Sequence, residues 1–185
     1  MNSGHSVPRC DLGDQLLDLP DAREPGTSSI CPGCVTQSTM LPACGATQPK
    51  RLYASTAREV FASNDLGETW QPLGIKRKWP LPYARGITVK ADDSGVLFAG
   101  CGETTTGEKG HVLRTANFGE TWETLPLPSQ PNATVWGLAT HPADANRIVA
   151  FSLFGEVYVT EDAGASWRKI AREFGEIRAA VWLPN

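Results

Sequence analysis

The sequence lacks any apolar run long enough to cross a bilayer as a helix, so no segment is predicted to span a membrane. Acidic side chains also interrupt the first 30 residues, where a secretory signal needs an unbroken apolar stretch. They are Asp11, Asp14, Asp18, Asp21 and Glu24. We therefore expect no membrane partner and find no export signal in the sequence as written, which leaves the location unknown and the cytoplasm as its default.

A strong excess of one charge is missing as well. The chain of 185 residues has 17 basic and 20 acidic residues, a net charge of -3, and this balance creates no global field that attracts nucleic acid. The basic stretch Lys76, Arg77 and Lys78 before Trp79 is short, and we interpret it as a solvated loop. A partner must therefore be recognised by a local site, and nucleic acid is not expected.

Cysteine is scarce after residue 44, where Cys101 alone remains of the five in the chain. Two of the others, Cys31 and Cys34, form the motif CPGC, and two thiolates at this spacing can hold a tetrahedral zinc ion together with Cys44 and Cys10. The second C-x-x-C motif that makes a zinc ribbon specific is missing. We favour free thiols and expect no cofactor, with a zinc site of Cys31, Cys34 and Cys44 as the weaker alternative.

Residues 1–49 also lack a sustained hydrophobic period, and Pro, Gly, Ser and Thr occur throughout them. We predict that this segment is irregular and poorly ordered. From residue 50 the chain becomes periodic, so a second region is predicted to span 50–185. With 18 glycines and 14 prolines, the chain has too many turn formers for a helical bundle, and an all-β fold is favoured.

The periodicity comes from an octapeptide that occurs three times, as SNDLGETW, TANFGETW and TEDAGASW. The copies begin at Ser63, Thr115 and Thr160, that is, 52 and 45 residues apart. This spacing is typical of a propeller, in which each repeat is one blade of four antiparallel strands. Three octapeptides therefore predict about three blades.

Short runs rich in β-branched and aromatic residues precede each octapeptide and read as strand pairs. The second strands of the blades (B) are RLYAS, VLFAG and RIVAF, and the third strands (C) are EVFAS, HVLRT and EVYVT. The first strands (A) are predicted in RGITVK and WGLATH. The first blade lacks such a segment, whereas IRAAVWLPN, residues 177–185, is predicted to be the A strand of a fourth blade.

The octapeptide itself is predicted to be the turn between the C strand and the last strand (D). Glycine supplies the positive φ of a tight turn, and Asp or Asn folds back onto backbone N–H groups. Ser or Thr adds a hydroxyl, and Trp is bulky enough to pack between blades. The residues in these roles are Ser63, Asp65, Gly67, Trp70, Thr115, Asn117, Gly119, Trp122, Thr160, Asp162, Gly164 and Trp167. We expect the turn carboxylates to be buried and too weakly basic for catalysis.

The pattern Ser/Thr-x-Asp-x-Gly-x-Thr/Ser-Trp resembles the Asp-box or BNR repeat of sialidase-like β-propellers. That family includes sialidases, other glycoside hydrolases, sortilin-type receptors and photosystem assembly factors, so the resemblance implies the fold more than the activity. It also implies that the Asp boxes lie on the propeller face opposite the ligand site. The ligand site is then expected on the D-to-A and B-to-C loops.

Aligning the A strands places Arg85, Trp136 and Arg178 at one equivalent position near the strand starts. Two guanidinium groups and an indole can bind a carboxylate and stack on a sugar ring or another planar group. The alternative is structural, with Arg85 and Arg178 paired to acidic neighbours such as Glu176. Glu103, in a glycine-bounded B-to-C loop, is a further candidate ligand-binding residue.

Two functional classes compete for this sequence. The first is a noncatalytic propeller that acts as a binding or assembly scaffold for a glycan or a protein. The second is a glycoside hydrolase, but the Arg-Ile-Pro segment of family sialidases is absent, and of the three tyrosines Tyr83 alone is expected outside the packed strands. A two-carboxylate mechanism needs facing acids such as Glu103 and Glu173. The scaffold is therefore favoured, with no catalytic residue assigned.

Blade number gives one further expectation. A closed propeller needs four to eight blades, and an unclosed end leaves unpaired strands. We therefore expect this chain to be the C-terminal part of a longer propeller, a shortened gene product whose first 49 residues are not native blade sequence, or a protomer that closes by forming a homo-oligomer.

Overall fold

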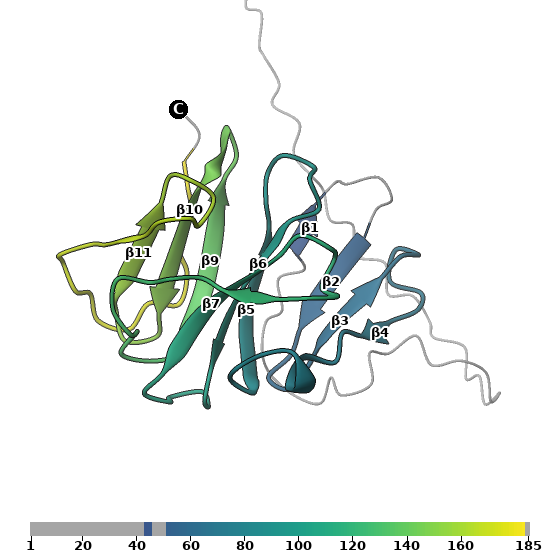
Figure 1. The fold of residues 1–185 in the computed structure, drawn as a ribbon, viewed down its shortest axis with the longest axis horizontal. Helices are drawn as coiled ribbons and strands as arrows, with labels where there is room; N and C mark the ends of the chain where they lie inside the picture. Colours follow the sequence, from purple (N-terminus) through teal and green to yellow (C-terminus); the bar gives the residue numbers. More distant parts are fainter. Residues whose placement is uncertain (1–42, 46–50, 184–185) are drawn as a thin grey trace, which may run out of the picture.

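A computed structural model describes residues 43–45 and 51–183, and the fold in these residues is all-β (Figure 1). Three sheets follow one another along the chain and lie side by side. The described residues contain no α-helix and one short 3-10 helix, η1 (Ile75–Arg77). No helix of membrane-spanning length and apolarity occurs in this part of the chain.

Each sheet is a blade of four antiparallel strands in sequential order. The first blade contains β1 (Ala43–Gly45), β2 (Arg51–Ser55), β3 (Val60–Ser63) and β4 (Gln71–Pro72). The second contains β5 (Tyr83–Val89), β6 (Leu97–Gly102), β7 (Gly110–Thr115) and β8 (Glu123–Thr124). The third contains β9 (Val135–His141), β10 (Asp144–Ser152), β11 (Val157–Thr160) and β12 (Arg168–Lys169). The predicted β-propeller blades are confirmed.

Two predicted details of the strands are wrong. The first blade has an A strand, because β1 pairs with β2 from Ala43 opposite Tyr53 to Gly45 opposite Arg51. Residues 177–183, predicted as a fourth A strand, form no strand. The rest of segment 1–49, predicted to be poorly ordered, lies outside the described residues.

The antiparallel order places the connections at two opposite ends of the blades. Within a blade, the A–B and C–D connections lie at one end of the strands, and the B–C loop lies at the other. The D–A connection to the next blade starts from the same end as the B–C loop. The octapeptide turns are therefore at the opposite end from the loops that were expected to bind a ligand.

Each octapeptide closes its turn with the same hydrogen bonds. In the third blade the Thr160 hydroxyl donates to Asp162 Oδ1 at 2.7 Å and accepts the Gly164 N–H at 3.0 Å. Asp162 in turn accepts the Ser166 N–H at 2.9 Å and the Ser166 hydroxyl at 2.5 Å. The equivalent bonds join Ser63, Asp65, Gly67 and Thr69 in the first blade and Thr115, Asn117, Gly119 and Thr121 in the second, where Asn117 Nδ2 donates to the Thr121 hydroxyl instead of accepting from it.

The backbone explains the glycine and reveals a second constraint. Gly67, Gly119 and Gly164 have φ values of 96°, 90° and 91°, in the region that favours glycine, as expected. The residue before each glycine also has a positive φ, between 56° and 60°, which the sequence alone did not indicate. These residues are Leu66, Phe118 and Ala163.

The turn carboxylates are not buried, contrary to expectation. Asp162 is exposed and Asp65 is half-exposed, whereas the hydroxyl-bearing Ser63, Thr115 and Thr160 are at most 2% exposed. Hydrogen bonds from the Ser166 hydroxyl, the Ser166 N–H and Thr160 lower the pKa of Asp162 to about 2. Thr69 and Ser63 lower the pKa of Asp65 to about 2 in the same way. Such carboxylates are weak bases and stabilise the turn.

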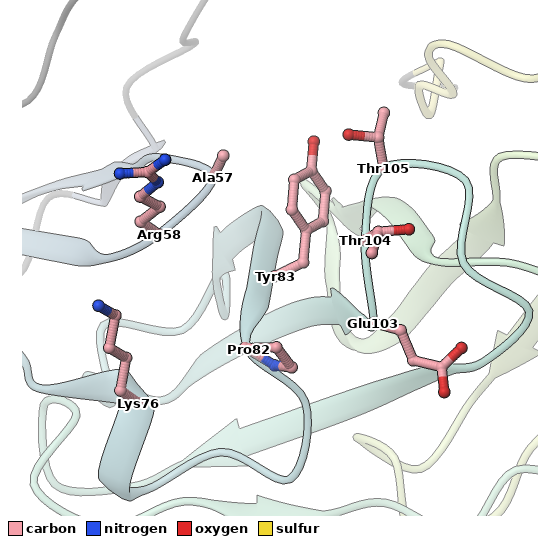
Figure 2. A pocket seen from close by; sticks show the side chains of 8 residues that line it. All are labelled: Ala57, Arg58, Lys76, Pro82, Tyr83, Glu103, Thr104 and Thr105. Carbon is pink, nitrogen blue, oxygen red and sulfur yellow. The ribbon is translucent and has the colours of Figure 1, made fainter.

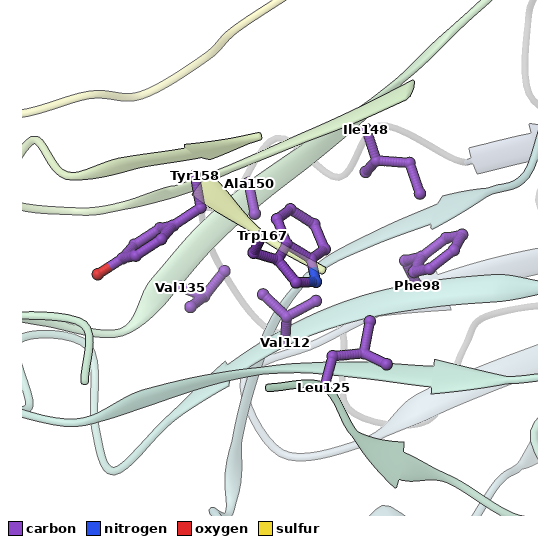
Figure 3. Close-up of a cluster of buried hydrophobic side chains, with 8 residues drawn as sticks. All are labelled: Phe98, Val112, Leu125, Val135, Ile148, Ala150, Tyr158 and Trp167. Atoms are coloured by element: carbon purple, nitrogen blue, oxygen red, sulfur yellow. The ribbon is translucent and has the colours of Figure 1, made fainter. Parts of the chain in front are cut away.

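The tryptophans of the second and third octapeptides pack between blades, as predicted. Trp167 lies in a buried cluster with Phe98, Val112 and Leu125 of the second blade and with Ile148 and Tyr158 of its own blade (Figure 3). Trp122 packs edge-on against Trp79, with ring centroids 5.1 Å apart. Each indole also donates to the carbonyl of its turn glycine, at 3.0 to 3.2 Å in all three copies.

Removing the buried hydroxyl should cost more than removing an exposed side chain of the same turn. Thr160→Ala leaves the Gly164 N–H without its acceptor, and we expect a loss of about 1 to 3 kcal/mol in the free energy of unfolding, measured by denaturant titration. Glu161→Ala is the control, because Glu161 is exposed in the same turn, and its effect should stay within about 0.5 kcal/mol. Equal effects of the two changes would contradict the role given to the hydroxyl.

Candidate functional site

Arg85, Trp136 and Arg178, which were predicted to occupy one equivalent position, lie together. The guanidinium carbon of Arg85 is 3.9 Å from the centroid of the Trp136 ring, and that of Arg178 is 5.2 Å from it. Arg85 belongs to β5, Trp136 to β9, and Arg178 to the segment after β12. The indole is 7% exposed. Both cations are therefore within cation–π range of one nearly buried ring.

Two glycines permit this arrangement. A Cβ added to Gly86 would lie 2.8 Å from the Cα of Gly137, so β5 and β9 can approach closely only without side chains there. Each glycine directly follows a residue of the cluster, Arg85 or Trp136. The repeated pair of a large side chain and a glycine at the start of the A strands is a sequence signal of this contact that was not used for prediction.

The cluster lines a cavity of about 230 Å³. Its other walls include Ser55, Leu138, Phe151 and Ala180. The Ser55 hydroxyl is buried and has no hydrogen-bond partner among the described residues, so it is a potential donor to a bound group. The cavity thus combines apolar walls, two guanidinium groups and one unsatisfied hydroxyl.

The structural alternative for Arg178 also holds in part. Arg178 forms an ion pair with Glu176, and their side chains are 67% and 48% exposed. An exposed pair of this kind adds little stability and breaks readily. Arg178 can therefore exchange Glu176 for another anion at small cost.

Glu103 does not belong to this cluster. It lines a second, open cavity of about 350 Å³ with Arg58, Lys76, Tyr83 and Thr105 (Figure 2). Its carboxylate points away from the Tyr83 hydroxyl in that view, and one of its oxygens lies 3.8 Å from Lys109 Nζ. The prediction grouped Glu103 with Arg85, but the two residues line different cavities of the same loop face.

Of the tyrosines considered for glycoside hydrolysis, Tyr83 is the first residue of β5 and lines the cavity of Glu103. Tyr53 and Tyr158 are 2% and 0% exposed, as expected for strand residues. Burial raises the pKa of Tyr158 to about 12, an effect that its hydrogen bond to Glu156 strengthens. Glu173, the acid considered as a partner for Glu103, lies 3.2 Å from Lys169 Nζ instead. In the described residues, no group of three or more His, Cys, Asp or Glu side chains could hold a metal.

The zinc alternative is not addressed by the structure. Cys10, Cys31 and Cys34 lie outside the described residues, and Cys44 is described only as part of the backbone of β1.

A buried polar network at the loop end was not predicted. Glu156, 6% exposed, accepts hydrogen bonds from the Asn132 N–H at 2.7 Å and the Tyr158 hydroxyl at 2.8 Å, and it pairs with Lys169. Burial favours the neutral acid, but these three donors outweigh it, so the pKa of Glu156 lies below its ordinary value. The network fixes the B–C loop of the third blade to the connection before β9. Asn132 and Lys169 are distant from Glu156 in the sequence, so no short motif predicts the network.

Comparison with known proteins places these features in a family. The family model described as Sortilin-Vps10 (Sortilin, neurotensin receptor 3) matches residues 58–181. Sortilin of Danio rerio is 26% identical over 113 residues, which are 60% of this chain and 13% of that protein. The photosystem II stability/assembly factor HCF136 of Arabidopsis thaliana is 29% identical over 128 residues, which are 68% of this chain and 30% of that protein. The chain thus spans less than a third of these relatives.

Solved structures are similar in fold. The GH74 enzyme of Niastella koreensis superposes with a TM-score of 0.51 at 16% identity, over 64% of this chain and 19% of that one. The structure described as YCF48 bound to D1 peptide superposes with a TM-score of 0.50 at 17% identity, over 78% of this chain and 47% of that one. At these identities the likeness supports the β-propeller fold alone.

The Glu156 network gives a pH-dependent prediction. Because the folded-state pKa of Glu156 is lowered from 4.5, its stabilising contribution is present above that value and is lost as the pH falls through the folded-state pKa. Glu156→Gln should lower the free energy of unfolding by about 1 to 3 kcal/mol near neutral pH. The variant should also lose less stability on acidification than the wild type does. Both expectations are tested by measuring the melting temperatures of the wild type and of Glu156→Gln over a pH series. Glu173→Gln, an exposed acid on the same lysine, is the control, and parallel curves for wild type and Glu156→Gln would contradict the prediction.

Proposed function

Because the chain belongs to the Sortilin-Vps10 family, we propose that it is a noncatalytic β-propeller scaffold that binds a segment of a partner protein at Trp136. The observation that carries this proposal is the convergence of Arg85 and Arg178 on one nearly buried indole, at the end of the blades away from the Asp boxes. The assembly-factor relatives support the scaffold role. The assignment of the site to Trp136 is our own and comes from the contacts of Arg85 and Arg178 with its ring.

The chemistry of the cavity favours an anionic or planar group. A carboxylate can accept from both guanidinium groups and from the Ser55 hydroxyl, while a flat ring can stack against the walls that Trp136 and Phe151 provide. A volume of about 230 Å³ suits one side chain or one chain terminus rather than a whole oligosaccharide. A peptide offers both groups.

The relatives support a protein partner rather than a sugar. HCF136 is named as an assembly factor, and YCF48 was solved with a peptide bound. A glycoside hydrolase remains the alternative of another class, because GH74 enzymes share the fold. However, the two acids that the sequence offered for hydrolysis, Glu103 and Glu173, each lie next to a lysine, Lys109 and Lys169 respectively.

The double variant Arg85→Ala, Arg178→Ala tests the site. Peptides with free carboxyl termini are selected from a random library on the wild-type protein, and their dissociation constants are measured by fluorescence anisotropy. We expect the double variant to bind at least about tenfold more weakly, because two charge-assisted contacts are lost. Arg147→Ala is the matched control, since Arg147 pairs with Asp144 at the Asp-box end, and its affinity should be unchanged.

Two other outcomes would overturn the proposal. Turnover of a fluorogenic sialoside that disappears in the double variant would identify an enzyme. Binding on a glycan array without selection of any peptide would identify a carbohydrate-binding module. Melting temperatures of both variants show whether a loss of binding comes from the site or from unfolding.

A further inference from the structure

A second cavity on the loop face has no role in the proposed function. It has a volume of about 350 Å³ and lies next to Tyr83, the first residue of β5. Its lining includes Arg58 from the B–C loop of the first blade, Lys76 from η1, and Thr105 from the B–C loop of the second blade. We call it the second cavity, and we call the cavity beside Trp136 the first cavity.

Two cations lie on one side of the second cavity. In Figure 2, Arg58 and Lys76 lie on the same side of the Tyr83 ring. Glu103 lies on the other side, and its carboxylate is turned away from the ring. Arg58 and Lys76 are exposed, and neither side chain forms an ion pair or a hydrogen bond with any other residue that the structure describes. The charge of both is therefore available to an anion in the cavity.

Glu59 joins the two segments that carry these cations. Its carboxylate oxygen Oε1 accepts the N–H of the following residue at 2.9 Å and the N–H of Ile75 at 3.1 Å. Arg58 directly precedes Glu59, and Lys76 directly follows Ile75. The Thr56 hydroxyl closes the same B–C loop, because it accepts the Glu59 N–H at 3.0 Å and donates to the Glu59 carbonyl at 2.8 Å. The backbone that carries both cations is thus fixed before a ligand binds, which lowers the entropic cost of binding.

The two cavities share two walls, so they lie side by side. Tyr83 lines the second cavity, and Arg85, two residues further along β5, lines the first. Ala84 between them is buried, so the side chains of Tyr83 and Arg85 leave the opposite face of the strand, about 7 Å apart. On the first blade, Ser55 lines the first cavity and Ala57 lines the second. An extended peptide rises about 3.4 Å per residue, so a segment bound along β5 reaches both cavities with groups two residues apart.

We propose that the second cavity binds an acidic side chain of the partner segment, two residues before the carboxyl-terminal residue that the first cavity holds. This inference rests on the proposed function, because it assigns a second contact of the same segment. Arg58 and Lys76 supply the opposite charge, and the hydroxyl groups of Tyr83 and Thr105 can donate to the same carboxylate. The partner therefore carries Asp or Glu at a fixed distance from its carboxyl terminus.

Two peptides that differ at one residue test the second cavity. Gly-Gly-Glu-Gly-Phe and Gly-Gly-Gln-Gly-Phe have free carboxyl termini, and their terminal ring and carboxylate suit the first cavity. By fluorescence anisotropy, we expect the wild type to bind the Glu peptide at least about fivefold more tightly than the Gln peptide. The variant Arg58→Ala, Lys76→Ala should bind both peptides as the wild type binds the Gln peptide. Arg77→Ala is the matched control, because Arg77 is an exposed cation of η1 that does not line the cavity, and it should keep the preference.

Position and charge reversal distinguish a site from general attraction between charges. Glu placed one residue before the end points to the opposite face of an extended segment, so its advantage over Gln should disappear. Lys76→Glu should lose the preference for Glu and should favour a peptide with Lys in its place. Melting temperatures show that the variants are folded, and a gained preference for Lys cannot come from unfolding.

The outcomes separate this inference from the proposed function. Equal binding of the Glu and Gln peptides by the wild type, a preference that persists in Arg58→Ala, Lys76→Ala, or the same preference at both peptide positions would each overturn the inference and leave the first cavity as proposed. If neither peptide binds the wild type, or if Arg85→Ala, Arg178→Ala binds them as the wild type does, the proposed function fails and the inference fails with it.

Discussion

The buried hydroxyl beneath each Asp-box turn is the contact on which the architecture depends. Ser63, Thr115 and Thr160 end the C strands and hold the turn glycine through its N–H. That glycine can then keep a positive φ and present a surface without a Cβ to the preceding blade. The same turn carries the tryptophan that fills the space between blades. A local hydrogen bond therefore determines how whole sheets pack.

The candidate site depends on a second close approach, between the A strands. Gly86 and Gly137 bring β5 and β9 near enough for Arg85 to cover the Trp136 ring. The segment after β12 contributes Arg178 without being a strand, because the Ile177 N–H donates to the Leu153 carbonyl at 3.1 Å and Trp182 Nε1 donates to the Ala139 carbonyl at 3.1 Å. These bonds hold the segment against the third blade, in the place that the next A strand would take.

Structural features that repeat between the blades were predicted from the sequence, and features that occur in one blade were not. The octapeptides, the B and C strands and the shared position of Arg85, Trp136 and Arg178 follow from alignment of the copies, because equivalent residues in a propeller have equivalent neighbours. The cavity of Glu103 and the Glu156 network involve B–C loops whose sequences differ from blade to blade. Their contacts join residues distant in sequence, so periodicity contains no information about them. The turn carboxylates were wrongly predicted to be buried, because a carboxylate that accepts hydrogen bonds from its own turn can still be exposed to solvent.

The two ends of the blades therefore serve different purposes. At the Asp-box end, the Ser, Thr, Asp and Asn side chains of each turn are hydrogen-bonded within the turn, and the Asp65 and Asp162 carboxylates, with a pKa of about 2, remain ionised and weakly basic. At the loop end, the Ser55 hydroxyl has no hydrogen-bond partner among the described residues, Arg178 pairs with an exposed acid, and a cavity lies beside a nearly buried indole. A ligand gains binding energy only where polar groups still lack partners or exchange them at small cost. Binding is therefore expected at the loop end, even though the repeated and most recognisable residues lie at the other.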